Sequence, residues 1–263
     1  MNTLVIKLGG HALESLEPDA PVLRQLANDI VELRAAGTRC VVVHGGGPQI
    51  AELLERAGVP SRFHEGLRVT DELTMRYVAM ALGEVNMRIV AALEQAGLEC
   101  VGLCGTDRSV LRAQSLGEPW ERAGGAPEVG ARFIESLWGI GLTPVISPVS
   151  VDAAGHLLNC NADTAAGALA GELRATALVL LSDIDQLRAD PDDPNSALDA
   201  VTSDDVRRLV ETGAARDGMR PKMTAALDAL EGGATRIVMA NGTRPHALRH
   251  ALDHTIPTTE VVR

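Results

Sequence analysis

Short β-branched segments alternate with longer amphipathic segments along most of this chain. Strands are predicted at residues 3–7, 39–43, 100–103, 143–146, 177–181 and 236–239. Helices are predicted at residues 22–36, from Pro48 onward, and at 71–96, 134–139, 163–173, 203–212 and 222–231. Such alternation is typical of a mostly parallel sheet that is covered on both faces. The pattern therefore predicts an α/β fold, a three-layer αβα sandwich.

Three segments interrupt this alternation. Residues 61–69 are predicted to form a hairpin or an irregular arm, residues 105–130 a polar, glycine-rich excursion, and residues 182–197 a charged loop. We find no internal repeat and no linker rich in Pro, Gly or Ser that would separate two domains. A single domain over residues 1–263 is expected, with two functional halves that divide near residues 150–175.

Composition narrows the possible functions. Hydrophobic residues make up 46% of the 263 residues and aromatic residues only 2%, so the core must consist mainly of Ala, Val, Leu and Ile. The formal net charge of −11 argues against a nucleic-acid partner, which is bound by excess Lys and Arg. No apolar run is long enough to span a membrane, and the strand-like start of the chain predicts that it has no signal peptide. The four cysteines include no C-x-x-C pair, which indicates a reducing cytoplasm.

Two glycine-rich segments each follow a predicted strand directly. Gly9 and Gly10 follow the first strand, and Gly45, Gly46 and Gly47 follow the second. Ligands bind at the carboxyl ends of parallel strands, and glycine lets backbone N–H groups approach a phosphate closely. Each segment alone is also compatible with a tight turn that binds nothing. Neither is a Walker A or a dinucleotide motif, because Gly-Lys-Ser/Thr is absent and GGGPQI lacks the last required glycine.

Charged and polar side chains accompany these loops. Lys7 ends an apolar strand and points either to solvent or into the ligand cleft, and Lys222 precedes an alanine-rich helix. Asp163 is a possible cap of the helix that follows it, and Asn159 and Asn161 are possible turn residues. No Ser/His/Asp triad and no Cys/His cluster is recognisable among them. The set therefore indicates a site that holds negative charge in place, which is the main requirement of phosphoryl transfer.

Six segments, taken in order, resemble the amino-acid kinase family: LVIKLGG, VVVHGGG, EGLRVTD, LLNCNADTAA, LLSDID and DGMRPKMTAALDAL. The resemblance covers nearly the whole chain, and EGLRVTD with NCNAD makes it strongest to the members that phosphorylate N-acetylglutamate. It implies a carbamate kinase-like fold and transfer of the γ-phosphoryl group of ATP, with its Mg²⁺, to the side-chain carboxylate of N-acetyl-L-glutamate. The product would be an acyl phosphate of arginine biosynthesis. A carboxylate with a pKa near ~4.3 is ionised at neutral pH, so this acceptor needs no general base.

The resemblance also implies roles for the matching residues. Lys7 and Lys222 would flank the transferring phosphoryl group, and Asp163 would hold both lysines in place. Arg68 would bind the α-carboxylate of the acceptor, because a planar guanidinium suits a carboxylate. The acceptor would bind in the half of the chain up to about residue 170, and the nucleotide in residues 171–263. The remaining implied site residues are Gly9, Gly10 and Gly45 in the backbone loops, Gly46, Gly47 and Asn159 at the acceptor, and Ser182, Asp183, Ile184, Asp185, Gln186, Leu187, Arg188, Ala214, Ala215 and Arg216 at the nucleotide.

The chain departs from the family pattern in three places. Gln186 stands where similar sequences have glycine, which leaves the adenine-side contacts open, and HTIPTTEVV lacks the glycine expected before its threonine. The chain begins at its first strand, whereas arginine-inhibited hexameric relatives carry an additional N-terminal helix. We therefore expect a homodimer with little or no feedback inhibition by arginine.

Three other functions fit the sequence less well. A kinase of aminoadipate on an acidic carrier protein would need a basic docking face, which a net charge of −11 disfavours. A non-catalytic sensor of the same fold would have no need of transition-state lysines. A dinucleotide-dependent dehydrogenase lacks its glycine pattern here.

Overall fold

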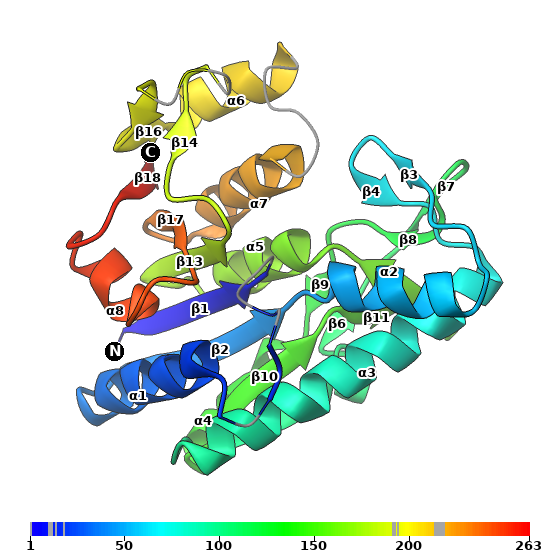
Figure 1. Cartoon of the computed structure of the whole chain (residues 1–263), viewed down its shortest axis with the longest axis horizontal. Coiled ribbons are helices and arrows are strands. Elements are labelled where there is room, and N and C mark those ends of the chain that lie inside the picture. Colours follow the sequence, from blue (N-terminus) through cyan, green and yellow to red (C-terminus); the bar gives the residue numbers. More distant parts are fainter. Residues whose placement is uncertain are drawn as a thin grey trace.

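An eight-stranded sheet forms the centre of the computed structural model, which describes residues 2–9, 13, 15–17, 19–190, 193, 195–212 and 219–263 (Figure 1). The strand order is β16-β18-β17-β13-β1-β2-β10-β5, and every neighbouring pair is parallel except β17 with β18. The strands are β1 (Thr3–Leu8), β2 (Arg39–His44), β5 (Cys100–Cys104), β10 (Thr143–Ser147), β13 (Ala177–Ser182), β16 (Ala200–Thr202), β17 (Ile237–Asn241) and β18 (Thr258–Val262). The predicted α/β class with a mostly parallel sheet is confirmed.

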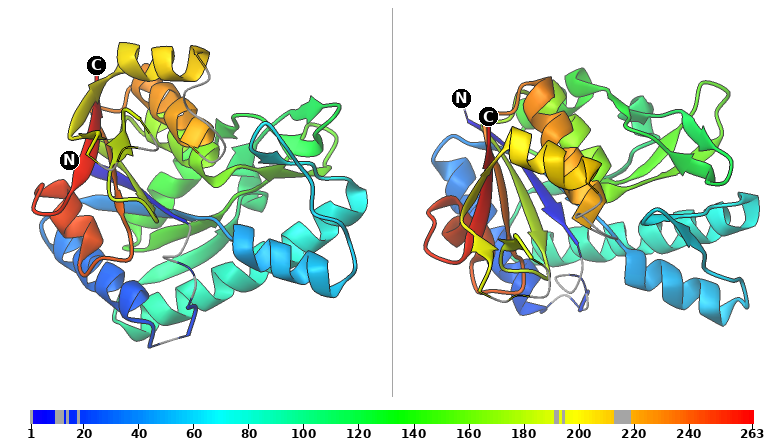
Figure 2. Two further views of the ribbon diagram at one scale, coloured as in Figure 1. Left: turned by 45° about the horizontal axis from the view of Figure 1, so that its top comes forward. Right: turned by 90° about the horizontal axis from the view of Figure 1, so that it is seen from above.

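Helices cover both faces of this sheet, as the two views in Figure 2 show. One face carries α1 (Pro21–Ala35), α3 (Glu72–Gln95) and α8 (Ala247–Leu252), and the other carries α4 (Ala131–Gly139), α5 (Ala162–Glu172), α6 (Ser203–Glu211) and α7 (Met219–Gly232). The remaining long helix, α2 (Gly47–Arg56), packs against α3.

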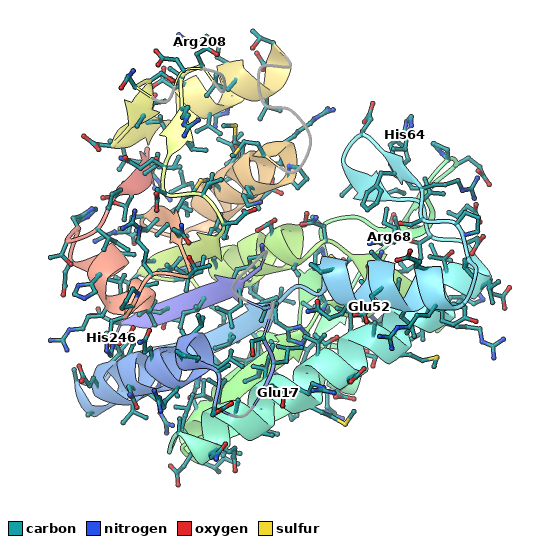
Figure 3. The ribbon with its side chains drawn as sticks, in the orientation of Figure 1. Glu17, Glu52, His64, Arg68, Arg208 and His246 are labelled. Atoms are coloured by element: carbon teal, nitrogen blue, oxygen red, sulfur yellow. The ribbon has the colours of Figure 1, made fainter. Side chains whose placement is uncertain are left out.

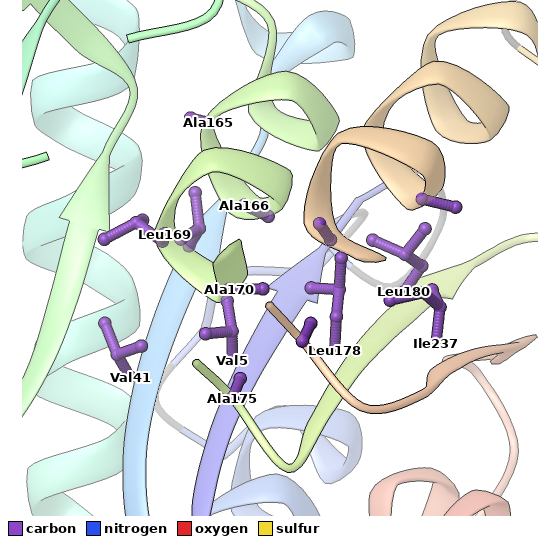
Figure 4. Close-up of a cluster of buried hydrophobic side chains, with 14 of the residues drawn as sticks. Val5, Val41, Ala165, Ala166, Leu169, Ala170, Ala175, Leu178, Leu180 and Ile237 are labelled. Carbon is purple, nitrogen blue, oxygen red and sulfur yellow. The ribbon is translucent and has the colours of Figure 1, made fainter. Parts of the chain in front are cut away.

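Alternate residues of each central strand enter the two hydrophobic layers. In β1, Val5 packs against α5 and α7, whereas Leu4 and Ile6 pack on the side of α1 and α3. Figure 4 shows Val5 with Leu178 beneath the small side chains of α5. Because both faces of the sheet are buried, the strands read as continuous apolar runs, which is why they were predictable.

A second sheet was not predicted. It has the order β7-β8-β12-β11-β6-β9 and contains most of the segment that was expected to be a polar excursion. Its strands are β6 (Leu111–Arg112), β7 (Ser115–Gly117), β8 (Glu121–Gly124), β9 (Glu128–Val129), β11 (Val149–Val151) and β12 (Leu157–Cys160). Strands this short show no clear hydrophobic alternation, so the sequence pattern cannot reveal them.

Smaller elements complete the fold. The predicted hairpin is β3 (Phe63–His64) with β4 (Leu67–Arg68), and the charged loop contains β14 (Leu187–Arg188), which pairs with β15 (Ala197–Leu198). The pattern predicted neither α8 nor β18, and α7 begins at Met219, earlier than the predicted start at residue 222.

The longest helix, α3, has a well-defined start. The side chain of Asp71 accepts a hydrogen bond from the backbone N–H of Thr74 at 2.7 Å, and Glu72 lies in the first turn, where a carboxylate interacts favourably with the helix dipole. Within the described residues, no helix combines the length and apolar character needed to cross a bilayer.

Helices α5 and α7 run parallel, and their backbones are in contact. A Cβ atom added to Gly167 would lie 2.6 Å from the carbonyl oxygen of Ala225, and one added to Gly232 would lie 2.7 Å from the Cα atom of Gly171. The two backbones can touch only because these positions carry little or no side chain. The contact places the first turns of the two helices next to each other at one end of the sheet.

We predict that Gly167→Ala lowers the free energy of unfolding by about 1–3 kcal/mol, because its methyl group would press on the backbone of α7. A melting temperature lower by roughly 2–4 °C per kcal/mol should result, measured by calorimetry. Gly139→Ala is the matched control, because a Cβ atom there meets nothing within 4 Å. Equal stability of Gly167→Ala and the wild type would show that the close helix contact is wrong.

Candidate active site

The carboxyl ends of β1 and β2 open into a pocket with a volume of about 230 Å³. It is bounded by both glycine loops, the β3–β4 hairpin and the start of α5. Its lining consists of Lys7, Gly9, Gly45, Gly46, Gly47, Pro48, Ile50, Phe63, Gly66, Leu67, Arg68, Leu82, Ala123, Gly124, Pro148, Asn159, Cys160, Asn161, Ala162 and Asp163. The pocket therefore combines cations and backbone amides with an apolar wall.

A buried ion pair lies at the floor of this pocket. The Nζ atom of Lys7 is 2.9 Å from Oδ1 of Asp163, and the two side chains are only 6% and 8% exposed. The lysine side chain folds back over the Cα atom of Gly9, where any Cβ atom would overlap the ammonium group. Glycine at position 9 thus gives Lys7 the space to turn toward α5 rather than toward solvent.

The interpretation of Asp163 as a helix cap is wrong. Asn161 caps α5, because its Oδ1 accepts hydrogen bonds from the backbone N–H groups of Asp163 at 2.8 Å and Thr164 at 3.2 Å. Asp163 itself lies in the first turn of the helix. Its carboxylate is consequently available to Lys7 instead of being used by the backbone.

Lys222 lies in the first turn of α7, close to the same charges. Burial lowers the pKa of Lys222, the carboxylates of Asp163 and Asp183 act in the opposite direction, and the ammonium group of Lys7 lowers it further. The contact of α5 with α7, which aligns their first turns, is consistent with these effects and places Lys222 near the pair of Lys7 and Asp163. The structure thus brings together three residues that are widely separated in the sequence.

The glycine loop after β2 leads directly into α2. The N–H of Gly45 donates a hydrogen bond to the carbonyl of Leu8 at 2.8 Å, and Gly46 precedes the first residue of the helix. The first N–H groups of a helix have no partners within the helix and favour an anion. Gly45, Gly46, Gly47 and Gly9 all reach the pocket, whereas Gly10 lies outside the described residues.

Arg68 ends β4 of the hairpin, and its side chain lies between the hairpin and α2, as Figure 3 shows. It is 8% exposed and donates hydrogen bonds to the hydroxyl of Ser61 and to the carbonyl of Gly47, the latter at 3.3 Å. Its guanidinium carbon is 4.7 Å from the ring centroid of Phe63. Burial lowers the pKa of Arg68 from its usual high value, and an arginine remains charged under any physiological condition.

Thr70 connects the two expected acceptor-binding residues, a role that the sequence analysis missed. Its hydroxyl donates to the backbone carbonyl of Arg68 at 2.8 Å and accepts from Nδ2 of Asn159 at 3.0 Å. A second link joins the hairpin to α7, where Nη1 of Arg220 is 3.6 Å from Oε2 of Glu65 at the tip of the hairpin. The spacing of these residues in the sequence gives no sign of either contact.

The expected nucleotide segment follows β13. Ser182 and Leu187 are buried, and Ile184 packs against the core on the side of α5 and α7. Arg244 donates to Asp185 at 2.7 Å, and this hydrogen bond is the largest of the effects that lower the pKa of that carboxyl. This segment begins at Ser182 and Asp183 and ends at Arg188. Of the other expected nucleotide residues, Ala214, Ala215 and Arg216 lie outside the described residues.

Gln186 uses its side chain within the protein. Its Nε2 donates to Oδ1 of Asp199 at 2.7 Å and to the carbonyl of Thr258 at 3.0 Å. The neighbouring hydroxyl of Thr259 accepts from the N–H of Leu187 at 2.8 Å. Two of the three departures from the family pattern, at Gln186 and in HTIPTTEVV, therefore fall in one place, where they join the loop after β13 to β18.

A buried histidine supports the glycine loop from below. Nδ1 of His44 is 2.8 Å from the carbonyl oxygen of Gly45, and its Nε2 is 3.0 Å from Nδ2 of Asn86 on α3. Desolvation lowers the pKa of His44 to about 4, an effect only partly opposed by its hydrogen bond with Gly45. The sequence pattern predicts no role for either residue.

The chain is similar to known proteins over most of its length. Residues 2–241 match the model of the amino acid kinase family. An acetylglutamate kinase of Symbiobacterium thermophilum is 40% identical over 256 residues, which cover 94% of this chain and 86% of that protein. The chain superimposes with a TM-score of 0.83 on N-acetylglutamate synthase from Neisseria gonorrhoeae in complex with coenzyme A and N-acetyl-glutamate, at 26% identity, covering 100% of this chain and 59% of that one. Carbamate kinase from Giardia lamblia bound to AMP-PNP shares the fold, with a TM-score of 0.72 at 19% identity over 100% of this chain and 98% of that one.

The pKa of His44 generates a prediction about acid stability. Below the pKa of an exposed histidine, ~6.5, the unfolded chain binds a proton that folded His44 does not bind until about pH 4. Folding stability is therefore lost as the pH falls through this interval, by about 3 kcal/mol from this group alone. In urea unfolding at several pH values, the free energy of unfolding should fall less steeply with decreasing pH in His44→Asn than in the wild type. Identical slopes would mean that His44 is not buried in its neutral form.

Proposed function

The chain belongs to the amino acid kinase family, and on that basis we propose that it transfers the γ-phosphoryl group of ATP to the side-chain carboxylate of N-acetyl-L-glutamate. The observation that carries this proposal is the buried pair of Lys7 and Asp163 at the floor of a pocket that also contains Arg68. The pocket presents cations and amides, which suit two anionic substrates. The named relatives add the identity of the acceptor, since they are acetylglutamate kinases and the match covers 94% of this chain and 86% of each of them.

The proposed step needs no proton transfer. A carboxylate oxygen of the acceptor forms a bond to the γ-phosphorus, and the bond from that phosphorus to the β,γ-bridging oxygen breaks, so that ADP leaves with the electron pair. Lys7 and Lys222 would neutralise the charge that develops on the transferring group and on the leaving oxygen, while Asp163 orients them. Mg²⁺ would enter with ATP and offset the charge of its phosphates.

Recognition of the acceptor would rest on the first half of the chain. Arg68 would bind the α-carboxylate, and Asn159, which is held by Thr70, would contribute a further hydrogen bond. The apolar wall that includes Ile50 and Leu82 suits the aliphatic part of the molecule. The nucleotide would bind over the second half, through backbone groups of residues 182–188 and through residues 214–216.

Acyl-phosphate trapping with hydroxylamine tests the proposal. N-acetylglutamate, glutamate, free aminoadipate and carrier-linked aminoadipate are offered in turn with MgATP, and only N-acetylglutamate should give a strong hydroxamate signal. Turnover only with a carrier-linked aminoadipate would support the other kinase of this fold, which the named relatives do not favour. Nucleotide binding with no turnover of any acceptor would identify a sensor.

The homodimer and the cellular setting are further parts of this proposal. Leu73, Met80 and Met87 are 47%, 61% and 67% exposed and recur every seven residues along α3, so they form one apolar stripe. A second copy of the chain is the proposed partner of this stripe. The acyl-phosphate product is consistent with arginine biosynthesis. The four free cysteines are consistent with the reducing conditions of the cytoplasm.

Light scattering after size-exclusion chromatography should give twice the mass of 27.7 kDa. Met80→Glu together with Met87→Glu should shift the protein toward the monomer, because charges would then face each other across the stripe. A wild-type mass of one chain, or of six, would contradict the dimer.

Lys7→Ala should lower kcat by roughly 10²–10³, the usual cost of removing one charged contact to a transition state. Lys7→Arg should restore little, because the guanidinium must fit in the same tight space above Gly9. Circular dichroism checks that both variants are folded. Lys222→Ala should behave like Lys7→Ala, and wild-type turnover in Lys7→Ala would contradict the mechanism.

Arg68→Ala should act mainly on substrate binding. We expect the KM for N-acetylglutamate to rise by roughly 10- to 100-fold, since a charge-assisted hydrogen bond contributes about 1.5–3 kcal/mol, while the KM for ATP changes little. Arg62→Ala, on the exposed part of the same arm, is the control. A lower kcat with an unchanged KM for the acceptor would argue against the proposed clamp.

A further inference from the structure

Three hydrogen bonds form a buried relay beneath the glycine loop. The amide Nδ2 of Asn86 lies 3.0 Å from the carbonyl oxygen of Val145 and 3.0 Å from Nε2 of His44. Nδ1 of His44 lies 2.8 Å from the carbonyl oxygen of Gly45. His44 is fully buried and Asn86 is 8% exposed, so both side chains need these partners.

The relay has one consistent direction. The carbonyls of Val145 and Gly45 can only accept, so the NH₂ group of Asn86 faces Val145 and the proton of His44 lies on Nδ1. Nε2 then carries the lone pair that accepts from the second N–H of Asn86. A flipped amide or the opposite tautomer would place two acceptors, or two donors, against each other.

The peptide unit between Gly45 and Gly46 connects these hydrogen bonds to the pocket. The Gly45 carbonyl and the N–H of Gly46 belong to one planar trans peptide, in which they point in opposite directions. With the carbonyl held by the buried imidazole, the N–H of Gly46 is directed away from it. Gly46 is also a lining residue of the pocket.

Two side chains of α3, Asn86 and Leu82, hold the glycine loop in this arrangement. A Cβ atom added to Gly102 would overlap Oδ1 of Asn86, so glycine in β5 leaves the space that the amide occupies. One turn earlier on α3, Leu82 contacts the loop itself, since a Cβ atom on Gly46 would lie 2.7 Å from its Cδ2 atom. Leu82 and Asn86 thus hold the loop at two adjacent points.

We propose that His44 and Asn86 are positioning residues that aim the N–H of Gly46 at the oxygens of the transferring phosphoryl group or the acceptor carboxylate. This role rests on the proposed phosphoryl transfer. Neither side chain is among the residues that line the pocket. Both act through the orientation of one peptide unit, whose donor has to be in place before the charge develops.

The neutral state of the imidazole suits this task. The low pKa of His44, about 4, keeps it uncharged at neutral pH. A protonated ring would point a second N–H at the amide of Asn86 and break the relay. A neutral histidine donates in one direction and accepts in the other, which neither lysine nor arginine can do.

Two isosteric substitutions at His44 distinguish the effect of hydrogen-bond donation to the carbonyl of Gly45 from the effect of filling the same space. The side-chain nitrogen of His44→Asn lies near the position of Nδ1 and can still donate to the loop, whereas that of His44→Gln lies near Nε2 and cannot. We expect His44→Gln and Asn86→Leu to lower kcat by roughly 10- to 100-fold with KM values within about threefold, and His44→Asn to retain more than a tenth of wild-type kcat. A kcat of His44→Gln equal to or above that of His44→Asn would overturn the proposal.

Stability is measured on the same variants. Thr143→Val is the matched control, because this buried hydroxyl at the start of β10 has no hydrogen-bond partner among the described residues. It should leave both kcat and KM unchanged. If the kcat of each variant instead followed its melting temperature, control included, the role of the relay would be structural only and the proposal would fail.

NMR gives a readout that does not depend on turnover. In ¹⁵N-histidine-labelled wild-type protein at pH 7, His44 should show a protonated Nδ1 and an unprotonated Nε2, with assignment from His44→Asn. The Gly46 amide should shift on addition of MgATP in the wild type and much less in His44→Gln. The opposite tautomer, or an unresponsive Gly46, would refute the proposal. If the wild type phosphorylates no acceptor but both NMR results hold, the proposed function fails while the relay stands.

Discussion

The buried ion pair between Lys7 and Asp163 is the interaction on which the rest of the site depends. Two charges that are each less than a tenth exposed lose most of their hydration, and only close mutual contact compensates for that loss. The contact requires a glycine at position 9, so that the lysine can turn, and a cap by Asn161, so that the carboxylate is free. An acidic protein of net charge −11 thereby presents a local cation to its pocket.

Helix packing brings the second cation to the same place. The small residues of α5 and α7 let the two backbones touch, and this contact aligns the first turns that carry Asp163 and Lys222. Lys7 and Lys222 are the only two lysines of the chain, whose other cationic side chains apart from histidine are arginines. A compact ammonium group suits a crowded phosphoryl site, whereas the planar guanidinium of Arg68 suits a carboxylate.

The opposite side of the pocket is built on α3. This helix packs against α2, supports the glycine loop through Leu82 and Asn86, and begins directly after the hairpin that carries Arg68. The hairpin in turn contacts α7 through Glu65 and Arg220. The elements that would bind the acceptor, the phosphoryl group and the nucleotide therefore meet at one end of the sheet, where parallel strands leave their polar carboxyl ends.

The sequence by itself determined the central strands, most of the helices, the glycine loops and the family, because buried parallel strands and amphipathic helices leave periodic patterns and the motifs are local. Tertiary structure alone decided that Asn161 rather than Asp163 caps α5, that residues 105–130 belong largely to a second sheet, and that Gln186 bonds to Asp199 and Thr258. It also revealed the links through Thr70, Glu65 and Asn86. Each of these depends on side chains or short strands that meet only after folding, and no local periodicity records such a meeting.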